Sequence, residues 1–264
     1  MLPEQTDRLG DELYAAMRER RTVAPLTERF ADVTIDDAYG VSRRMLERRL
    51  ADGERVVGKK IGVTSEVVQK MLDVHQPDFG FLTDAMMFED GAQVPIDRLL
   101  IQPRAEGEIA FVLARDLVGP DVTEEDAIAA TRCVRPCFEI VDSRIRDWKI
   151  RIQDTVADNA SSGVFVLGKN EVDPRSLDLK TCRIAVDKNG APLSQGLGAA
   201  ALGSPAYCVA WLANTLARFG IPLRAGEIVL SGSLVPLESV RAGDRMHLEL
   251  EGIGSASVAF VEGP

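Results

Sequence analysis

The sequence predicts an α+β protein in which a small helical N-terminal segment precedes a larger β-rich domain. Up to about residue 55, apolar residues recur at the three- and four-residue spacing of amphipathic helices. After Gly58, short apolar segments separated by Gly, Pro and Asp indicate many strands and few helices. We place the boundary near residue 70, which gives a mostly helical domain over 1–70 and a β-rich domain over 71–264.

The N-terminal helices are predicted by periodicity and by a capping signal. Between residues 5 and 21, three apolar residues share one helical face: Leu9, Leu13 and Met17. Residues 34–37 form a capping box that precedes a second helix.

The remaining elements are predicted from short apolar runs and from turn signals. Two helices are expected, one starting at Thr123 and one running from Ser204 to Gly220. Asn189-Gly190 is typical of a hairpin turn. Strands are expected over residues 105–113, 138–142, 163–167, 182–186, 227–230, 246–250 and 255–261.

Composition excludes several classes of partner and site. Lys and Arg total 31 against 41 Asp and Glu, a net charge of −10 that makes nucleic acid and anionic membranes poor partners. With only two histidines, a metal site would be held mainly by oxygen. The four cysteines lack a C-x-x-C pair, and residues 1–10 lack a signal-peptide pattern, so we expect a cytoplasmic protein with free thiols. The uncharged stretch 191–217 is broken by Gly, Ser and Pro, which favours a loop and a buried helix over a membrane span.

Three carboxylates lie inside predicted strands. Glu106 and Glu108 share one face of a strand because side chains alternate with period two, and Glu139 lies in another apolar strand. A solvated outer face would explain the first pair, but Ala110 and Val112 continue the same face as apolar. Three inward carboxylates suit a hard divalent cation such as Mg²⁺ or Mn²⁺ with positions left open for water and substrate.

A lysine pair and two aspartates are further candidates. Lys59 and Lys60 lie in an apolar run, so alternation would expose one lysine and turn the other inward. An inward lysine near carboxylates would donate a proton or bind an anionic substrate, whereas two surface lysines are the ordinary alternative. Asp78 and Asp158 lie in turn-rich segments, where each either organises a turn or joins a site.

Several of these segments together resemble a known family. They resemble the 2-hydroxypentadienoate (2-oxopent-4-enoate) hydratases of aromatic meta-cleavage pathways, and nearly the whole chain fits. These hydratases belong to the fumarylacetoacetate hydrolase superfamily, so the resemblance implies a fumarylacetoacetate-hydrolase-like mixed β-roll or barrel with a small helical N-terminal domain. The segments are GKKIGVTS (58–65), QPDFG (76–80), AEGEIAF (105–111), EIVDSR (139–144), DTVADNAS (154–161), AAALGSP (199–205) and SGSLVP (231–236).

The resemblance implies a reaction and a set of site residues. The reaction is ketonisation of 2-hydroxypenta-2,4-dienoate followed by addition of water, which gives 4-hydroxy-2-oxopentanoate. Lys60 would stabilise the enolate oxygen or shuttle a proton, and Asp78 would act as an acid or base or hold Lys60. The remaining implied residues are the Mg²⁺ or Mn²⁺ ligands Glu106, Glu108 and Glu139, and the substrate-binding residues Ser161, Ser233 and Asp158.

Some alternatives stay open at this level. A sister family, 4-oxalocrotonate decarboxylase, shares the acid pair and the VADNAS segment, and a non-catalytic partner subunit is a third hypothesis. The resemblance implies a homo-oligomer, with a 4-oxalocrotonate decarboxylase or a downstream aldolase as partner protein. The length of the dienoate, the choice between Mg²⁺ and Mn²⁺, the number of subunits and the residue that delivers the proton are not determined by the sequence.

Overall fold

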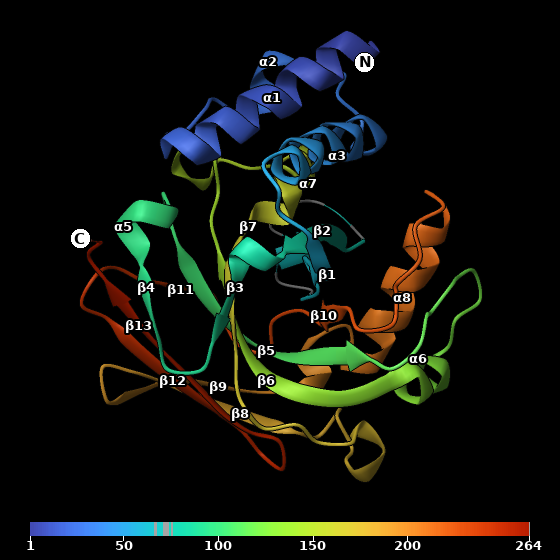
Figure 1. The fold of residues 1–264 in the computed structure, drawn as a ribbon, viewed down its shortest axis with the longest axis vertical. Coiled ribbons are helices and arrows are strands. Elements are labelled where there is room, and N and C mark those ends of the chain that lie inside the picture. Colours follow the sequence, from blue (N-terminus) through green and yellow to red (C-terminus); the bar gives the residue numbers. More distant parts are fainter. Residues whose placement is uncertain (66–67, 71–73, 75, 264) are drawn as a thin grey trace.

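The computed structural model describes residues 1–65, 68–70, 74 and 76–263. It is an α+β fold with two mixed β-sheets and a group of N-terminal helices, as the sequence predicts (Figure 1). The helices α1, α2 and α3 lie together at one end of the molecule, and α7 packs against α3. The N-terminal helices span Pro3–Glu19 (α1), Leu26–Arg29 (α2) and Ile35–Ala51 (α3).

Local sequence explains where these helices begin and what they bury. The expected capping box is confirmed at the start of α3. The Thr34 hydroxyl accepts a hydrogen bond from the backbone amide of Asp37, and the Asp37 carboxylate accepts one from the backbone amide of Thr34. Helix α1 buries the predicted apolar stripe against α3, including Leu9 and Leu13. Packing of this stripe stabilises the pair, because short isolated helices are marginal in water.

The larger sheet carries the candidate site residues. Its strands follow the order β2-β1-β10-β5-β6-β7-β3, and β11 pairs with β5. One face packs on the main hydrophobic core, and the other encloses a separate small apolar cluster: Leu82, Met86, Ala110, Cys137, Phe165, Leu167, Ile228 and Leu230. The strands span Val56–Gly62 (β1), Asp78–Thr83 (β2), Met87–Glu89 (β3), Arg104–Leu113 (β5), Thr131–Val141 (β6), Ser162–Leu167 (β7), Ile228–Leu230 (β10) and Glu238–Ser239 (β11).

The second sheet has five strands and packs against β6 and β7 through β12 and β13. The hairpin predicted at Asn189-Gly190 is confirmed between β8 and β9, and both residues have the positive φ that this turn requires. Alternate residues of β12 are buried, so one face of this sheet joins the core. In sheet order the strands are Ala92–Pro95 (β4), Gly254–Val261 (β13), Arg245–Leu250 (β12), Arg183–Lys188 (β8) and Ala191–Leu197 (β9).

The remaining helices connect the strands. The capping signals at Thr123 and Ser204 are confirmed, since each hydroxyl accepts an amide in the first turn of the helix that follows. The uncharged stretch 191–217 contains strand β9 as well as helix α8, and no described helix is long and apolar enough to cross a membrane. These helices are Ile96–Leu99 (α5), Glu124–Ala130 (α6), Ile152–Ala157 (α7) and Pro205–Ala217 (α8), with 3₁₀ turns at Asp84–Met86, Arg146–Trp148, Asn159–Ser161, Pro174–Ser176 and Gly198–Ala200.

The large sheet begins earlier in the chain than expected. Strand β1 pairs with β10 in parallel and with β2 in antiparallel orientation, so it belongs to the sheet although it precedes residue 70. The helices α1 to α3 end at Ala51. The division into domains over 1–70 and 71–264 stays a prediction.

Three contacts connect the N-terminal segment to the sheet and to α7. The amide and hydroxyl of Thr27 donate to the buried Asp154 carboxylate in α7, at 3.1 and 2.7 Å. Backbone hydrogen bonds join Val23 to the segment that follows β6. The Tyr39 ring of α3 stacks on Phe79 of β2, with centroids 4.2 Å apart. The N-terminal helices therefore support the two elements, β2 and α7, that flank the site described below.

The Thr27 contact leads to a stability prediction. Thr27→Val is expected to lower the free energy of unfolding by about 1–3 kcal/mol, because it leaves an oxygen of the buried Asp154 carboxylate without its hydroxyl donor. Thr27→Ser keeps the hydroxyl and serves as the control. Urea denaturation of the three proteins measures the effect, and equal stability of the Val and Ser variants would contradict it.

Candidate metal centre and active site

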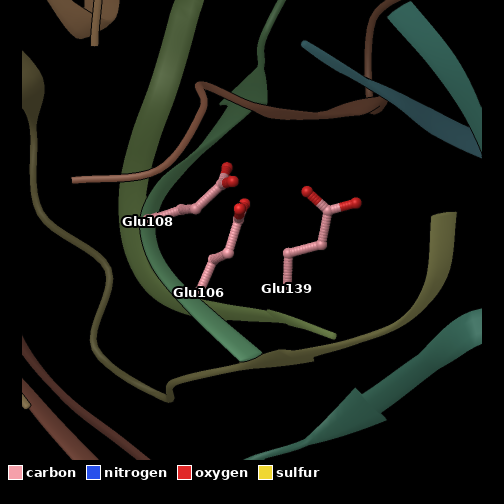
Figure 2. Close-up of side chains that lie close together, drawn as sticks. All are labelled: Glu106, Glu108 and Glu139. Atoms are coloured by element: carbon pink, nitrogen blue, oxygen red, sulfur yellow. The ribbon is translucent and has the colours of Figure 1, made fainter. Parts of the chain in front are cut away.

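The three predicted glutamates come together on one face of the large sheet. In the β5–β6 ladder Glu106 is paired with Glu139, and Glu108 lies two residues further along β5. One oxygen from each carboxylate lies within 4.8 Å of the others, and Figure 2 shows the three groups pointing into the same space. Glu108 and Glu139 are buried, whereas Glu106 is partly exposed. Because paired residues share a face, this face is also that of the small apolar cluster.

Burial and mutual repulsion disfavour the ionised form of these carboxyls. Burial, reinforced by the charge of Glu139, raises the pKa of Glu106 to about 7. Burial also raises the pKa values of Glu108 and Glu139, where the charge of Lys60 opposes it. A cation placed between the carboxylates would remove this penalty.

The unpaired oxygens of the cluster fit a hard cation. Oε1 of Glu108 and both carboxylate oxygens of Glu139 are buried without a hydrogen-bond partner, which is unusual for charged groups. The other Glu108 oxygen accepts the Gly232 amide at 2.9 Å. Converging carboxylate oxygens without nitrogen or sulfur ligands are the donor set that Mg²⁺ and Mn²⁺ prefer.

Lys60 turns into the same site from β1. Its Nζ lies 3.3 Å from Oε1 of Glu139, and the residue is only 3% exposed. Burial lowers the pKa of Lys60, but the attraction of Glu139 and Asp78 outweighs it, so the pKa is raised. Lys60 therefore stays a positively charged ammonium at neutral pH.

The expectation that alternation would expose one of the two lysines is wrong. Lys59 is also 3% exposed, and its Nζ lies 2.6 Å from Oε2 of Glu227 on the opposite face. Residues 58–61 of strand β1 are all buried, and because successive side chains point to opposite faces, both faces of the strand are covered there. An inner strand with two covered faces buries even a charged side chain if a partner is present.

Asp78 begins β2 and lies close to Lys60 by register. It pairs with Gly62 of β1, where an added Cβ would lie 2.3 Å from Asp78 Oδ1 and 3.1 Å from Lys60 Nζ. Only glycine therefore leaves room for both groups. Burial raises the pKa of Asp78, although the charge of Lys60 and a hydrogen bond from Thr155 oppose the increase. Asp78 Oδ1 is buried without a hydrogen-bond partner.

Ser161 lies on a strained turn beside these groups. Residues 159–161 all have positive φ, between 51° and 54°, a backbone conformation that is unfavourable for residues other than glycine. The Asn159 side chain secures this turn by hydrogen bonds to both backbone groups of Phe81 in β2. The Ser161 hydroxyl lies 3.2 Å from that of Thr155. These hydrogen bonds hold the strained turn, and with it Ser161, next to β2 and α7.

Asp158, for which the resemblance implies a substrate-binding role, is hydrogen-bonded inside the protein to Arg144. Its Oδ1 accepts a hydrogen bond from Arg144 Nε at 2.5 Å, and its Oδ2 accepts one from the Arg144 backbone amide at 2.8 Å. The two residues are fully buried, and Arg144 also donates to three backbone carbonyls around the turn. Asp158 is therefore the internal partner of a buried arginine, and burial still raises the pKa of Asp158 to about 6 against the charge of Arg144. The EIVDSR segment carries no local signal for this partner, because Asp158 lies 14 residues further along the chain.

Ser233 borders the acids, but its hydroxyl is used locally. It donates to the Val235 carbonyl at 2.5 Å and closes a turn, while the preceding Gly232 amide binds Glu108. Ser231 is fully buried, and its hydroxyl has no hydrogen-bond partner. Neither Ser231 nor Thr155 was singled out from sequence, because no local pattern marks a buried hydroxyl as functional.

Known proteins that are similar to this chain share this architecture. The family described as fumarylacetoacetate (FAA) hydrolase C-terminal matches residues 55–261. The chain belongs to the fumarylacetoacetate hydrolase family. Within the family, it is 62% identical over 254 residues to 2-hydroxyhexa-2,4-dienoate hydratase of Comamonas testosteroni, covering 96% of both chains. It is 68% identical over 213 residues to 2-hydroxypent-2,4-dienoate hydratase of Pseudomonas putida, covering 81% of this chain and 96% of the relative.

Solved structures that are similar to this chain agree with the fold. A 4-oxalocrotonate decarboxylase from Pseudomonas putida G7, complexed with magnesium and adipate, is 35% identical and has a TM-score of 0.96 over 99% of both chains. Fumarylpyruvate hydrolase from Pseudomonas aeruginosa, in complex with Mn²⁺ and pyruvate, has a TM-score of 0.63 over 78% of this chain and 89% of the hydrolase, at 15% identity. The second comparison bears on the fold alone.

The raised pKa of Glu106 leads to a pH prediction for the metal-free protein. Its pKa is about 7 in the folded protein against an ordinary value of 4.5, so the unfolded chain loses this proton first as the pH rises. The free energy of unfolding of the wild-type protein therefore falls between pH 4.5 and 7. The Glu106→Gln variant lacks this carboxyl, so its free energy of unfolding relative to wild type is expected to rise from pH 4.5 to 7 and then to level off.

Urea denaturation in EDTA across this pH range measures the difference. The exposed Glu251 provides a matched control, since Glu251→Gln makes the same substitution at a solvated carboxylate outside the three-glutamate cluster. A constant difference between wild type and Glu106→Gln would contradict the prediction.

Proposed function

We propose that this protein is a metal-dependent hydro-lyase that adds water to 2-hydroxypenta-2,4-dienoate or its six-carbon homologue. The product of the five-carbon substrate is 4-hydroxy-2-oxopentanoate. The observation that carries the proposal is the cluster of three carboxylates, two of them buried and one partly exposed, next to Lys60 and Asp78. Hydratase relatives at 62% and 68% identity support the same reaction, and their names include both substrate lengths.

Glu106, Glu108 and Glu139 would hold a divalent cation, Mg²⁺ or Mn²⁺. The two 4-oxalocrotonate decarboxylase structures, 35% and 34% identical to this chain, were complexed with magnesium and with calcium, which supports a divalent ion without selecting one. When bound, the cation supplies Lewis-acid chemistry for the carboxylate and 2-oxo oxygens of the substrate. The three carboxylates lie on adjoining strands of a rigid sheet, so the site is formed before any ligand arrives.

Lys60 and Asp78 would have different roles: Lys60 would stabilise developing negative charge, and Asp78 would transfer protons. The raised pKa of Lys60 keeps its proton in place, so Lys60 serves as a fixed positive charge for the oxygen on which negative charge develops. Asp78 has a pKa raised by burial, which makes its carboxyl the better group to accept and return a proton. Ser161 would contact the substrate carboxylate or the attacking water. Ser233 would do so only after its hydroxyl leaves the Val235 carbonyl.

Decarboxylation of 4-oxalocrotonate is the second candidate reaction. The decarboxylase structure with a TM-score of 0.96 shows that the same scaffold serves that enzyme. Its 35% identity is well below that of the hydratases, which favours hydration here. A homo-oligomeric state, a cytoplasmic location, and a decarboxylase or aldolase partner stay predictions.

Ultraviolet absorbance of freshly generated 2-hydroxypenta-2,4-dienoate tests the proposal directly. Purified protein is assayed with Mg²⁺, with Mn²⁺ and with EDTA, and 4-oxalocrotonate is tested alongside. Metal-dependent loss of the dienoate signal with formation of 4-hydroxy-2-oxopentanoate is expected. Consumption of 4-oxalocrotonate alone, with release of CO₂, would replace hydration by decarboxylation, and no reaction with either substrate would refute both.

The role of Lys60 is tested with its neighbour as control. Lys60→Met is expected to lower kcat by about 10²–10³-fold, the usual loss when one preorganised electrostatic donor is removed. Lys59→Met removes an equally buried lysine on the opposite face, so it should reduce stability but leave kcat within about threefold. Mn²⁺ binding by calorimetry shows whether the carboxylate cluster is intact. Near-normal turnover by Lys60→Met with metal bound would refute the assignment.

A further inference from the structure

The hydroxyl of Thr155 lies between two groups of the proposed active site. Its Oγ1 is 3.3 Å from Asp78 Oδ2, to which it donates, and 3.2 Å from the Ser161 hydroxyl. All three residues are at least 95% buried, with exposures of 4%, 1% and 3% for Thr155, Asp78 and Ser161. The three side chains therefore form a short hydrogen-bonded chain that connects β2, α7 and the strained turn.

The backbone around Thr155 is held on both sides. The preceding residue, Asp154, accepts from the backbone of Arg151 and from Thr27, which secures the first turn of α7. Ser161 is fixed on the other side by the turn that Arg144 and Asp158 organise. The chain of hydroxyls is thus set by the fold and does not depend on mobile side chains.

We propose that Thr155 is a positioning residue that couples the proton on Asp78 to the direction in which the Ser161 hydroxyl donates. The inference rests on the proposed function, since it assigns Asp78 the proton transfers of that reaction. A hydroxyl carries one proton, so Thr155 can donate to only one of its two neighbours at a time.

The two states follow from this restriction. When Asp78 is ionised, Thr155 donates to it and accepts from Ser161, whose proton is then directed away from the substrate. When Asp78 holds a proton, it donates to Thr155, which in turn donates to Ser161 and frees the Ser161 proton for the substrate or water.

Proton transfer along the chain is balanced. The Asp78 proton passes to Thr155, the Thr155 proton passes to Ser161, and the Ser161 proton passes to the acceptor. Each oxygen of the two hydroxyls loses one proton and gains one, so the net change is transfer of one proton from Asp78 to the acceptor.

The test compares Thr155→Val with Thr155→Ser in the metal-loaded dienoate assay. Valine keeps the shape without the hydroxyl, so kcat is expected to fall by about 10²-fold, the lower end for a positioned proton transfer, with KM nearly unchanged. Serine restores the hydroxyl, and kcat should return to within about threefold of wild type. Retention of wild-type kcat by the valine variant would overturn the proposal.

Thr131→Val is the matched control for removal of a buried hydroxyl. Thr131 is 1% exposed and donates to the Ala127 carbonyl at 2.7 Å, at the opposite end of the β5–β6 ladder from the Glu106–Glu139 pair. This variant should lose stability without losing kcat. If Thr155→Val loses Mn²⁺ binding, or is destabilised far more than Thr131→Val, its role is structural and the proposal fails.

An infrared titration of Asp78 separates this inference from the proposed function. The carboxyl band removed by Asp78→Asn is followed in Mg²⁺-loaded wild type and Thr155→Val, and the pKa of Asp78 should rise in the variant because a donor to the ionised form is lost. The other charged or titratable groups around Asp78 are the same in both proteins: Lys60, Tyr39, Glu106 and Glu139. If wild type fails to consume the dienoate, the proposed function fails, while an unchanged Asp78 pKa would overturn the coupling itself.

Discussion

Repulsion among three clustered carboxylates, two of them fully buried, is the constraint around which the site is organised. Glu106 and Glu139 are opposite each other in one ladder, and Glu108 lies two positions away, so the sheet register forces like charges together. Lys60 supplies one neutralising charge, and the Gly232 amide supplies one hydrogen bond. The carboxylate oxygens without a hydrogen-bond partner are those expected to bind a cation. In the proposed ion site, the cost of this repulsion to the stability of the metal-free protein would be offset when a cation binds.

The glycines near the site follow from the same crowding. A side chain at Gly62 would occupy the space of the Asp78 carboxylate, and one at Gly232 would collide with Thr64 at 2.5 Å. Gly232 also has a φ of 94°, which other residues rarely adopt. Both positions let a backbone approach charged side chains closely, so the lysine and the acids share one compact space.

The N-terminal helices contribute to the site although they lie outside the segment matched by the family. That segment begins at residue 55, whereas Tyr39 packs on β2 and Thr27 binds Asp154 of α7. The buried Arg144–Asp158 pair connects the strained turn to the same region. The groups proposed to transfer protons, Asp78 on β2 and Thr155 on α7, are thus supported by residues outside the three-glutamate cluster.

The sequence by itself determined the features that arise within one element or one turn. Period-two alternation placed Glu106 and Glu108 on one face, and the capping boxes and the Asn189-Gly190 hairpin follow from local hydrogen bonding. Apolar runs and turn signals also marked Glu139, Lys60 and Asp78 as candidates, and the resemblance implied their roles beside the pair. Tertiary structure alone decided which polar side chains are paired: Lys59 with Glu227, 168 positions away, and Thr155 with Asp78, 77 positions away. A local pattern reports the face on which a side chain lies, but the partner on that face depends on how distant segments pack.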